Sequence, residues 1–191
     1  MQRGDVLRAL AERREGAVVV ATMTALDAWR ELSPSDLNMS CVGFMGGAST
    51  LGLGIALARP ERRLMILDGD GSLLMQLGSL ATIAGAAPKN FYHFLFHNGV
   101  YEVSGSQQIP AEGRIDFAGM ARAAGYASAH RFDDLEELRT GLPSVLQQEG
   151  PVFIELAITP AGETLRGGGR PNQVADEARA LRQALAGDAQ G

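Results

Sequence analysis

The segment Gly69-Asp70-Gly71-Ser72 combines residue types that could bind a metal ion and a phosphate group. Glycines let the backbone approach a ligand closely, and free N–H groups at a helix start attract phosphate. We therefore expect the N–H groups of Gly71, Ser72 and Leu73 to face an anion. A carboxylate repels a phosphate unless a cation lies between them, so Asp70 favours a bridging divalent metal. An ordinary turn with Ser72 as helix cap is the alternative that these residues leave open.

Short apolar runs lie just before this segment and before other polar segments of the chain. The runs cover residues 17–21, 64–67, 91–96 and 152–156. None of them alternates polar with apolar residues, which is typical of strands buried on both faces of a parallel sheet. Ligands of such sheets bind beyond the carboxyl ends of the strands. The residues that follow each run are therefore the candidates for one functional site.

Helical spacing of apolar residues separates these runs. The expected helices cover residues 6–16, 48–58, 72–86, 117–124, 133–148 and, with a polar composition, 174–185. This alternation predicts a three-layer α/β/α domain around a parallel sheet of about six strands. We expect the domain to cover residues 1–165. The remainder, 166–191, contains a glycine break at 167–169 and a helical tail that packs on the domain or on a partner.

Composition excludes several classes of protein. The 191 residues include 17 Lys and Arg and 22 Asp and Glu, giving a net charge of −5, and the pI is about 5.2. An acidic chain without a basic cluster argues against nucleic acid or an anionic membrane as partner. Cys41 is the single cysteine, which excludes a disulfide framework. The amino terminus lacks an apolar signal core, and we expect a cytoplasmic location.

The spacing of two motifs resembles the signature of thiamine diphosphate enzymes, in which Gly-Asp-Gly is followed just under thirty residues later by Asn-Asn. Here Asn98 lies 28 residues after Asp70. Residues 41–49 and the following helix to residue 60 look like the Gly-Ser-Met-Gly-x-Ala-Ser stretch of phosphonopyruvate and sulfopyruvate decarboxylases. Residues 99–107 resemble the loop after their Asn-Asn. The resemblance implies a thiamine diphosphate-binding fold, specifically the diphosphate-binding half of such an enzyme.

Several site residues follow from this resemblance. It implies that Asp70, the side-chain oxygen of Asn98 and the carbonyl of Val100 bind Mg²⁺, together with oxygens of the diphosphate. It also implies that Gly43 offers its carbonyl to the aminopyrimidine and that Met45 is the apolar wedge that bends the cofactor. The implied cofactor-binding residues are Gly43, Phe44, Met45, Gly46, Gly69, Gly71, Ser72 and Tyr101.

Two departures from the family pattern stand out. His97 occupies the position of the first Asn, which changes hydrogen bonds around the metal ligands without removing a ligand. The segment from 22 to 29, expected to be a loop after the first strand, matches the family poorly. Relatives contact the diphosphate from this loop, so Thr22 or Thr24 is the candidate substitute.

The resemblance also implies what the chain lacks. The family needs a glutamate from a pyrimidine-binding domain, and 191 residues hold one domain. We therefore expect an α subunit as partner, an isolated chain that is inactive and self-associates, and Phe44 and Met45 in the interface. The implied substrate is a small anionic 2-oxo acid, 3-sulfopyruvate or 3-phosphonopyruvate. Half of an acetolactate-synthase-like carboligase and a non-catalytic interaction module are the alternatives.

Other conspicuous residues have structural interpretations. The polar loop residues Tyr101, Ser104, Ser106 and Gln107 could donate hydrogen bonds to substrate or simply form a mobile lid. We expect His93 to be a packed or partly exposed strand residue and His130 to end a strand. In the last strand, we expect Glu155 either to be buried with its hydrogen bonds satisfied or to lie at an edge of the sheet. We expect Trp29 and Cys41 to lie in the core or an interface. Gly52 and Gly54 do not follow a strand, which argues against a nicotinamide site.

Overall fold

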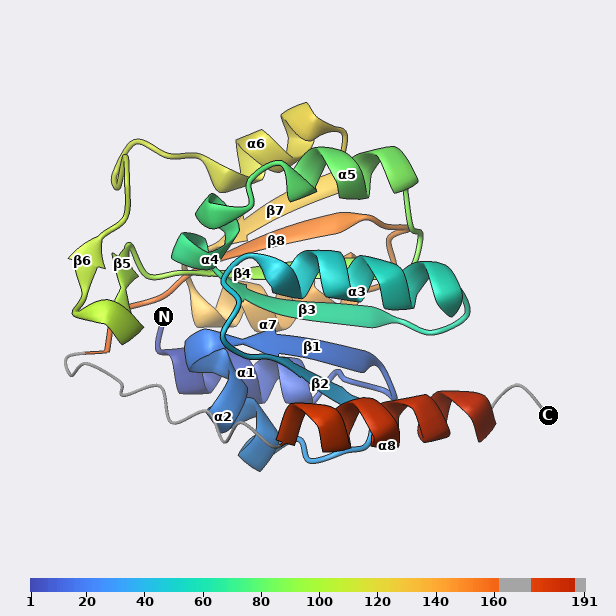
Figure 1. Cartoon of the computed structure of the whole chain (residues 1–191). Helices are drawn as coiled ribbons and strands as arrows, with labels where there is room; N and C mark the ends of the chain where they lie inside the picture. Colours follow the sequence, from blue (N-terminus) through green and yellow to red (C-terminus); the bar gives the residue numbers. More distant parts are fainter. Residues whose placement is uncertain (162–172, 188–191) are drawn as a thin grey trace.

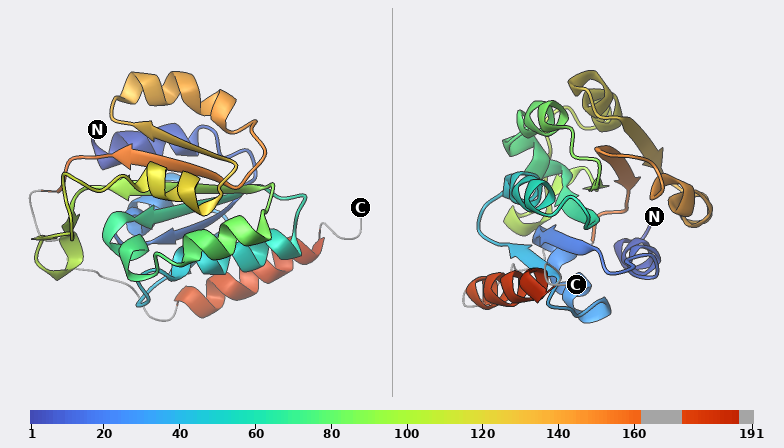
Figure 2. Two further views of the ribbon diagram at one scale, coloured as in Figure 1. Left: turned by 90° about the horizontal axis from the view of Figure 1, so that it is seen from above. Right: turned by 90° about the vertical axis from the view of Figure 1, so that its right-hand side faces the viewer.

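The computed structural model describes residues 1–161 and 173–187. A six-stranded, entirely parallel sheet in the order β2-β1-β3-β4-β8-β7 forms its centre (Figure 1). Helices cover both faces, as the end-on view in Figure 2 shows. The predicted three-layer α/β/α fold with about six parallel strands is therefore confirmed.

The sheet strands are β1 (Val18–Thr22), β2 (Asn38–Cys41), β3 (Leu64–Gly69), β4 (Phe91–His97), β7 (Ser128–Phe132) and β8 (Val152–Ala157). The helices are α1 (Arg3–Ala11), α2 (Met23–Leu32), α3 (Gly47–Ala58), α4 (Asp70–Met75), α5 (Ser79–Ala86), α6 (Phe117–Ala124), α7 (Leu135–Val145) and α8 (Gln173–Gly187). A small antiparallel pair, β5 (Val100–Tyr101) and β6 (Gln107–Gln108), encloses the 3₁₀ turn η1 (Glu102–Ser104).

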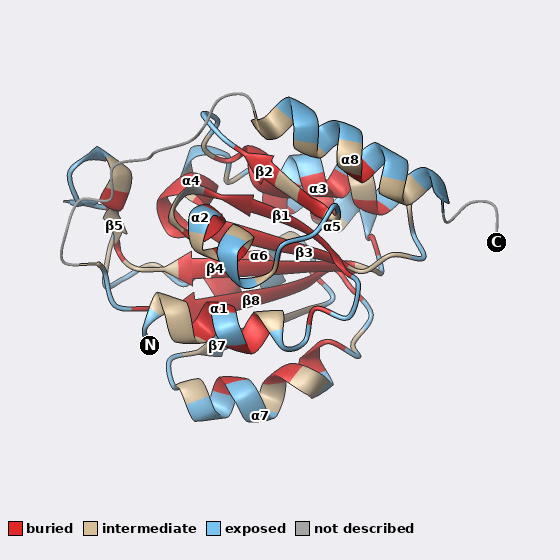
Figure 3. Ribbon diagram, turned by 90° about the horizontal axis from the view of Figure 1, so that it is seen from below, coloured by how far each residue is buried: buried red, intermediate tan, exposed pale blue. Residues whose placement is uncertain are grey.

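Two apolar layers hold the helices to the sheet, because successive strand side chains point to opposite faces. In β1, Val19 and Ala21 belong to the buried cluster that includes side chains of α1, α2 and α7, whereas Val18 and Val20 belong to the cluster that includes side chains of α3, α5 and α6. Figure 3 shows the buried residues concentrated in the strands and on the inner sides of the helices. This double coverage explains the apolar runs without alternation.

Topology brings the two candidate motifs together. β3 and β4 are adjacent parallel strands, with Gly69 opposite Phe96. Asp70 and Asn98 follow these strands at the same edge of the sheet, as expected. α4, β5 and β6 gather at this edge (Figure 1).

Two expectations about the helices and loops were wrong. The stretch 72–86 is not one helix, because the chain turns after α4 at Gln76, whose side chain lies against Gly46. The segment 22–29 is not a loop: α2 starts there, since Ala25, Leu26 and Trp29 recur at helical spacing and bury against the sheet.

The edges of the sheet hold the other differences. His130 lies in the middle of β7 rather than at its end. β2 was not expected, since it is short and contains Asn38 and Ser40. Other elements satisfy these polar groups. Trp29 Nε1 of α2 donates to Asn38 Oδ1 at 3.1 Å, and Arg30 Nη2 of α2 donates to Ser40 Oγ at 2.8 Å. The backbone Ser40 N donates to Glu177 of α8 at 2.9 Å.

The tail helix α8 packs on the domain through Leu181, which is buried, and through an ion pair between Arg30 and Glu177. The predicted domain limit at 165 and the glycine break at 167–169 lie outside the described residues. Within the described ranges, no helix is long and apolar enough to cross a membrane.

Candidate functional site

Asp70 connects the ends of the two central strands. Its side chain is buried at the start of α4, where Oδ1 accepts a hydrogen bond from Gly71 N at 2.7 Å. Oδ2 accepts from Asn98 N at 2.9 Å and from Gly99 N at 2.7 Å. One carboxylate therefore holds the turn after β4 against the end of β3.

Burial raises the pKa of Asp70, and the backbone N–H donors and the charge of His97 oppose that shift only in part. Among the described residues, no Lys or Arg forms an ion pair with this carboxylate. A buried carboxylate that accepts hydrogen bonds only from backbone N–H groups is an environment that favours a bound cation. This observation fits the magnesium ion that the family resemblance implies.

A pocket lies directly beside Asp70. It is lined by Thr24, Met45, Gly69, Asp70, Gly71, Ser72, Phe96, Asn98, Val100, Tyr101, Glu102 and Val103. Eight of these residues belong to the expected site, and the structure brings them together from α4 and from the segments after β2, β3 and β4. Most of the polar side chains that line the pocket carry oxygen atoms, which are the ligands that a hard cation prefers. Within the described residues, no cluster of three or more His, Cys, Asp or Glu offers a competing metal site.

Gly71 and Tyr101 form one wall of the pocket through close contact. A Cβ atom at Gly71 would lie 2.4 Å from Tyr101 Cε1, so only glycine permits the ring to lie on the start of α4. The expectation that the Gly71 N–H is free for a phosphate was wrong, because this N–H donates a hydrogen bond to Asp70 Oδ1. The turn alternative for Ser72 does not hold either, since its hydroxyl accepts from Gly46 N at 2.8 Å rather than capping α4.

The glycine-rich segment lies partly outside the pocket. Gly43 has a positive φ of 74° with open space around it, and Gly46 contacts the site through Ser72. The Phe44 ring packs over Gly47 and is 55% exposed, so it does not line the pocket. Of the eight residues expected here and in the Gly69–Ser72 motif, only Gly43, Phe44 and Gly46 are absent from the lining.

The two threonine candidates have different surroundings. Thr22 is buried and donates its hydroxyl to Cys41 O at 2.8 Å. Thr24 lies in the first turn of α2 and lines the pocket. The structure therefore leaves Thr24 as the one positioned to meet a ligand.

His97 joins the metal-ligand turn to its surroundings. Nδ1 lies 2.9 Å from Glu155 Oε1, and Nε2 lies 3.1 Å from Glu112 Oε2. The hydrogen bond to Glu155 is the main cause that raises the pKa of His97 to about 9. Glu155 also accepts from Ala118 N at 3.1 Å, so it is satisfied within an interior strand, as expected.

Sequence reasoning did not identify Glu102, Phe96 and Val103 as pocket residues. Phe96 ends an apolar run, which is typical of a core residue, and Val103 is one apolar residue in a polar loop. Glu102 is buried, yet the sequence around it resembles an exposed loop. Its burial depends on partners far along the chain, which a local pattern does not reveal.

The architecture is that of an open α/β domain with its ligand site at the carboxyl ends of the central strands. Residues 18–156 match the family described as "Thiamine pyrophosphate enzyme, C-terminal TPP binding domain". The chain belongs to this family, and thiamine pyrophosphate is another name for thiamine diphosphate.

Similar proteins include two kinds of decarboxylase. A phosphonopyruvate decarboxylase of Streptomyces viridochromogenes is 41% identical over 165 residues, covering 86% of this chain and 41% of the relative. A sulfopyruvate decarboxylase subunit beta of Methanothermobacter thermautotrophicus is 40% identical over 119 residues, covering 62% of this chain and 60% of the relative. The chain thus spans less than half of the first relative and less than two thirds of the second.

A solved structure supports the fold. The X-ray structure of a thiamin diphosphate-dependent enzyme from Mycobacterium smegmatis superposes with a TM-score of 0.71. The match covers 84% of this chain and 32% of that one at 22% identity.

Proposed function

We propose that the pocket beside Asp70 binds thiamine diphosphate through Mg²⁺. Asp70, the Asn98 side-chain oxygen and the Val100 carbonyl would hold the ion, and Ser72 and Thr24 would lie near the diphosphate. The observation that carries this proposal is the buried Asp70 carboxylate, which is held only by neutral donors at the meeting point of two strands. A cation there removes the cost of burying a charge.

The remaining residues would orient the cofactor. Met45 lines the pocket as a bulky apolar side chain, and Gly43, which has a positive φ, would offer its carbonyl to the aminopyrimidine. Tyr101 closes the wall over Gly71. Bound thiamine diphosphate supplies an electron sink for the loss of CO₂ from 2-oxo acids, and the chain supplies its position.

We also propose the substrate class and the need for a partner. The relatives named phosphonopyruvate and sulfopyruvate decarboxylase indicate 3-phosphonopyruvate or 3-sulfopyruvate as substrate. Relatives that are named subunit beta of sulfopyruvate decarboxylase favour a pyrimidine-domain α subunit as the source of the glutamate that activates the aminopyrimidine. The exposed loop residues Ser104, Ser106 and Gln107 lie next to Tyr101 and could donate hydrogen bonds to a dianionic substrate. A cytoplasmic location stays a prediction from the sequence.

The partner would dock on the glycine-rich face. We define this face by Val42, Phe44 and Met75, whose side chains belong to the exposed large hydrophobic residues. Phe44 packs over Gly47, and Gln76, next to Met75, contacts Gly46. An exposed apolar surface around a cofactor site favours a protein interface.

An assay of CO₂ release tests the substrate and the partner together. The chain is reconstituted with the pyrimidine-domain chain, thiamine diphosphate and Mg²⁺, and then receives 3-sulfopyruvate, 3-phosphonopyruvate or pyruvate. We expect release from one of the two anionic substrates and none without the second chain. Preference for pyruvate, with acetolactate as product, would instead identify a carboligase.

A further inference from the structure

Glu102 is a second buried carboxylate of the cofactor pocket. It starts the turn η1, and its side chain is 1% exposed. It lines the pocket beside Tyr101, which contacts Gly71, and follows Val100, the third proposed metal ligand, by two residues. The position of Glu102 therefore affects both the wall of the pocket and the metal-binding turn.

Two partners hold Glu102, and both lie outside the segment 18–156 that matches the family. Arg3 of α1 forms an ion pair with Glu102 Oε2, and its side chain is 13% exposed. Ala161 N donates to Glu102 Oε1 at 2.7 Å. Segments before and after the family domain thus meet at a residue of the pocket wall.

The segment formed by β5, η1 and β6, which includes this part of the pocket wall, has few hydrogen bonds within itself. β5 and β6 pair through two residues each, and an isolated two-stranded hairpin is marginally stable at best. Two backbone hydrogen bonds add to this pairing, Ile109 N to Gly99 O at 3.0 Å and Ser106 N to Tyr101 O at 2.9 Å. A contact with a rigid element is therefore needed to fix the wall.

α1 is such an element. Val6, Leu7 and Leu10 are fully buried against the sheet. Thr159 N donates to Met1 O at 2.8 Å, which ties the residues just before α1 to the chain after β8. Arg3 therefore projects from a well-anchored helix toward the pocket wall.

We propose that Arg3 and Glu102 are positioning residues for the cofactor site, which rests on the proposed binding of thiamine diphosphate and Mg²⁺. Arg3 holds Glu102, and Glu102 holds Val100 and Tyr101 in the arrangement that receives the metal-bound cofactor. Removing Arg3 leaves an uncompensated buried carboxylate, which moves toward water and carries the wall with it. Arg3 thus raises affinity without touching the ligand.

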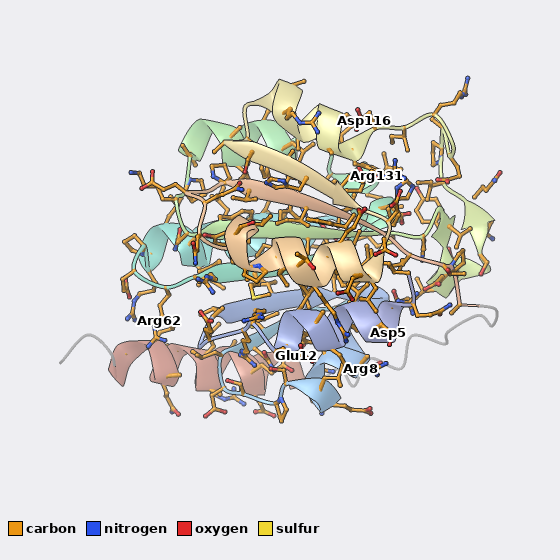
Figure 4. The ribbon with its side chains drawn as sticks, turned by 180° about the vertical axis from the view of Figure 1, so that it is seen from behind. Asp5, Arg8, Glu12, Arg62, Asp116 and Arg131 are labelled. Atoms are coloured by element: carbon orange, nitrogen blue, oxygen red, sulfur yellow. The ribbon has the colours of Figure 1, made fainter. Side chains whose placement is uncertain are left out.

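The same helix offers a matched control. Arg8 pairs with Asp5, and their side chains are 55% and 36% exposed. Figure 4 labels both residues on α1, and neither of them lines the pocket. Exposed pairs of this kind contribute little to stability. Arg8→Met therefore removes one arginine and one ion pair from α1 without disturbing the wall.

The test measures binding of thiamine diphosphate at saturating Mg²⁺ by calorimetry, well below the unfolding temperature of each variant. Arg3→Met should weaken binding by about tenfold or more, whereas Arg8→Met should stay within about twofold of the original chain. Arg3→Lys should recover most of the affinity. Arg3→Met combined with Glu102→Gln should bind better than Arg3→Met alone, because the uncompensated charge is gone.

A ligand-free measurement separates positioning from general stability. Amide hydrogen exchange of residues 100–103 should be faster in Arg3→Met than in Arg8→Met. Equal affinity of Arg3→Met and the original chain, with unchanged exchange, would overturn this inference while leaving the cofactor site intact. If the original chain itself does not bind thiamine diphosphate with Mg²⁺, the proposed function fails and the positioning role fails with it.

Discussion

Asp70 and Glu102 are two buried carboxylates of one pocket with opposite electrostatic surroundings. Glu102 is paired with the guanidinium of Arg3, whereas Asp70 accepts hydrogen bonds only from backbone N–H groups. A carboxylate in direct contact with a guanidinium has little attraction left for a further cation, whereas one that accepts hydrogen bonds only from backbone N–H groups is not neutralised by an ion pair. This contrast assigns metal binding to Asp70 and a structural charge to Glu102.

Cys41 gives a prediction on pH dependence at the residue scale. The thiol is buried and lies 3.5 Å from Phe44 O, and burial, followed by the charge of Asp68, raises its pKa to about 11. The thiolate is the reactive form, so its fraction at pH 8 falls about a hundredfold relative to a thiol with a pKa of 9. Alkylation of the native protein should be slower by about that factor and should accelerate as pH rises toward 11.

The same protein in denaturant is the control, since Cys41 is the only cysteine and reports alone. The measurement is the rate of iodoacetamide incorporation by mass spectrometry. Equal rates for native and denatured chains at pH 8 would contradict the burial and the raised pKa of this thiol.

Site residues were predictable where the chemistry is local. Gly69, Asp70 and Gly71 follow an apolar run directly, and the position of Asn98 after the next run was expected from the same rule. Glu102 was not predictable, because the arginine that allows its burial stands 99 residues earlier. The burial of a charged side chain cannot be predicted from the neighbouring sequence when its ion-pair partner lies far along the chain.

At the scale of elements, α3 shows two glycines in different roles. A Cβ atom at Gly52 would lie 2.1 Å from Ile66 Cδ1 in the core, whereas at Gly54 it would meet no atom within 4 Å. Gly52→Ala should therefore lower the free energy of unfolding by about 1–3 kcal/mol through overpacking. Gly54→Ala should raise it by about 0.5–1 kcal/mol, since alanine favours the helix.

Denaturant unfolding of both variants measures this difference. The pair is matched, because both substitutions add one methyl group to the same helix. Equal effects of the two would show that α3 does not pack on β3 through Gly52.

Elements buried on both sides were the predictable ones. β1, β3, β4 and β8 appear in the sequence as apolar runs because both faces of the sheet are covered. The edge strand β2 was missed, since its polar residues find partners in α2 and α8 that only the tertiary structure provides. Helical spacing also predicted one helix over residues 72–86. The structure has two helices there, α4 and α5, and the chain turns between them where Gln76 packs on Gly46.

At the scale of the whole molecule, the glycine-rich face predicts association. The isolated chain should self-associate through Phe44, because the partner that would cover this side chain is absent. Phe44→Ser should shift the chain toward monomer in sedimentation velocity. Leu57→Ser is the matched control, since Leu57 is also 55% exposed but lies at the other end of α3. A monomeric original chain, or an equal effect of Leu57→Ser, would contradict the role of this face.

Calorimetric titration with thiamine diphosphate tests the magnesium-dependent cofactor site most directly. The original chain should bind in the presence of Mg²⁺ and lose binding when the metal is chelated. Asp70→Ala should weaken binding by about a hundredfold or more, because the charge that offsets the cation is removed, and Asn98→Ala should weaken it less.

Asp116→Ala provides the control for this titration. Asp116 is also an aspartate at a helix start, where it caps α6 by accepting from Gly119 N at 2.7 Å, but it does not line the pocket. Its replacement should cost about 1 kcal/mol of stability and leave cofactor affinity unchanged. Loss of metal-dependent binding in Asp70→Ala but not in Asp116→Ala is the predicted result, and unchanged metal-dependent binding in Asp70→Ala would contradict the assignment of this site.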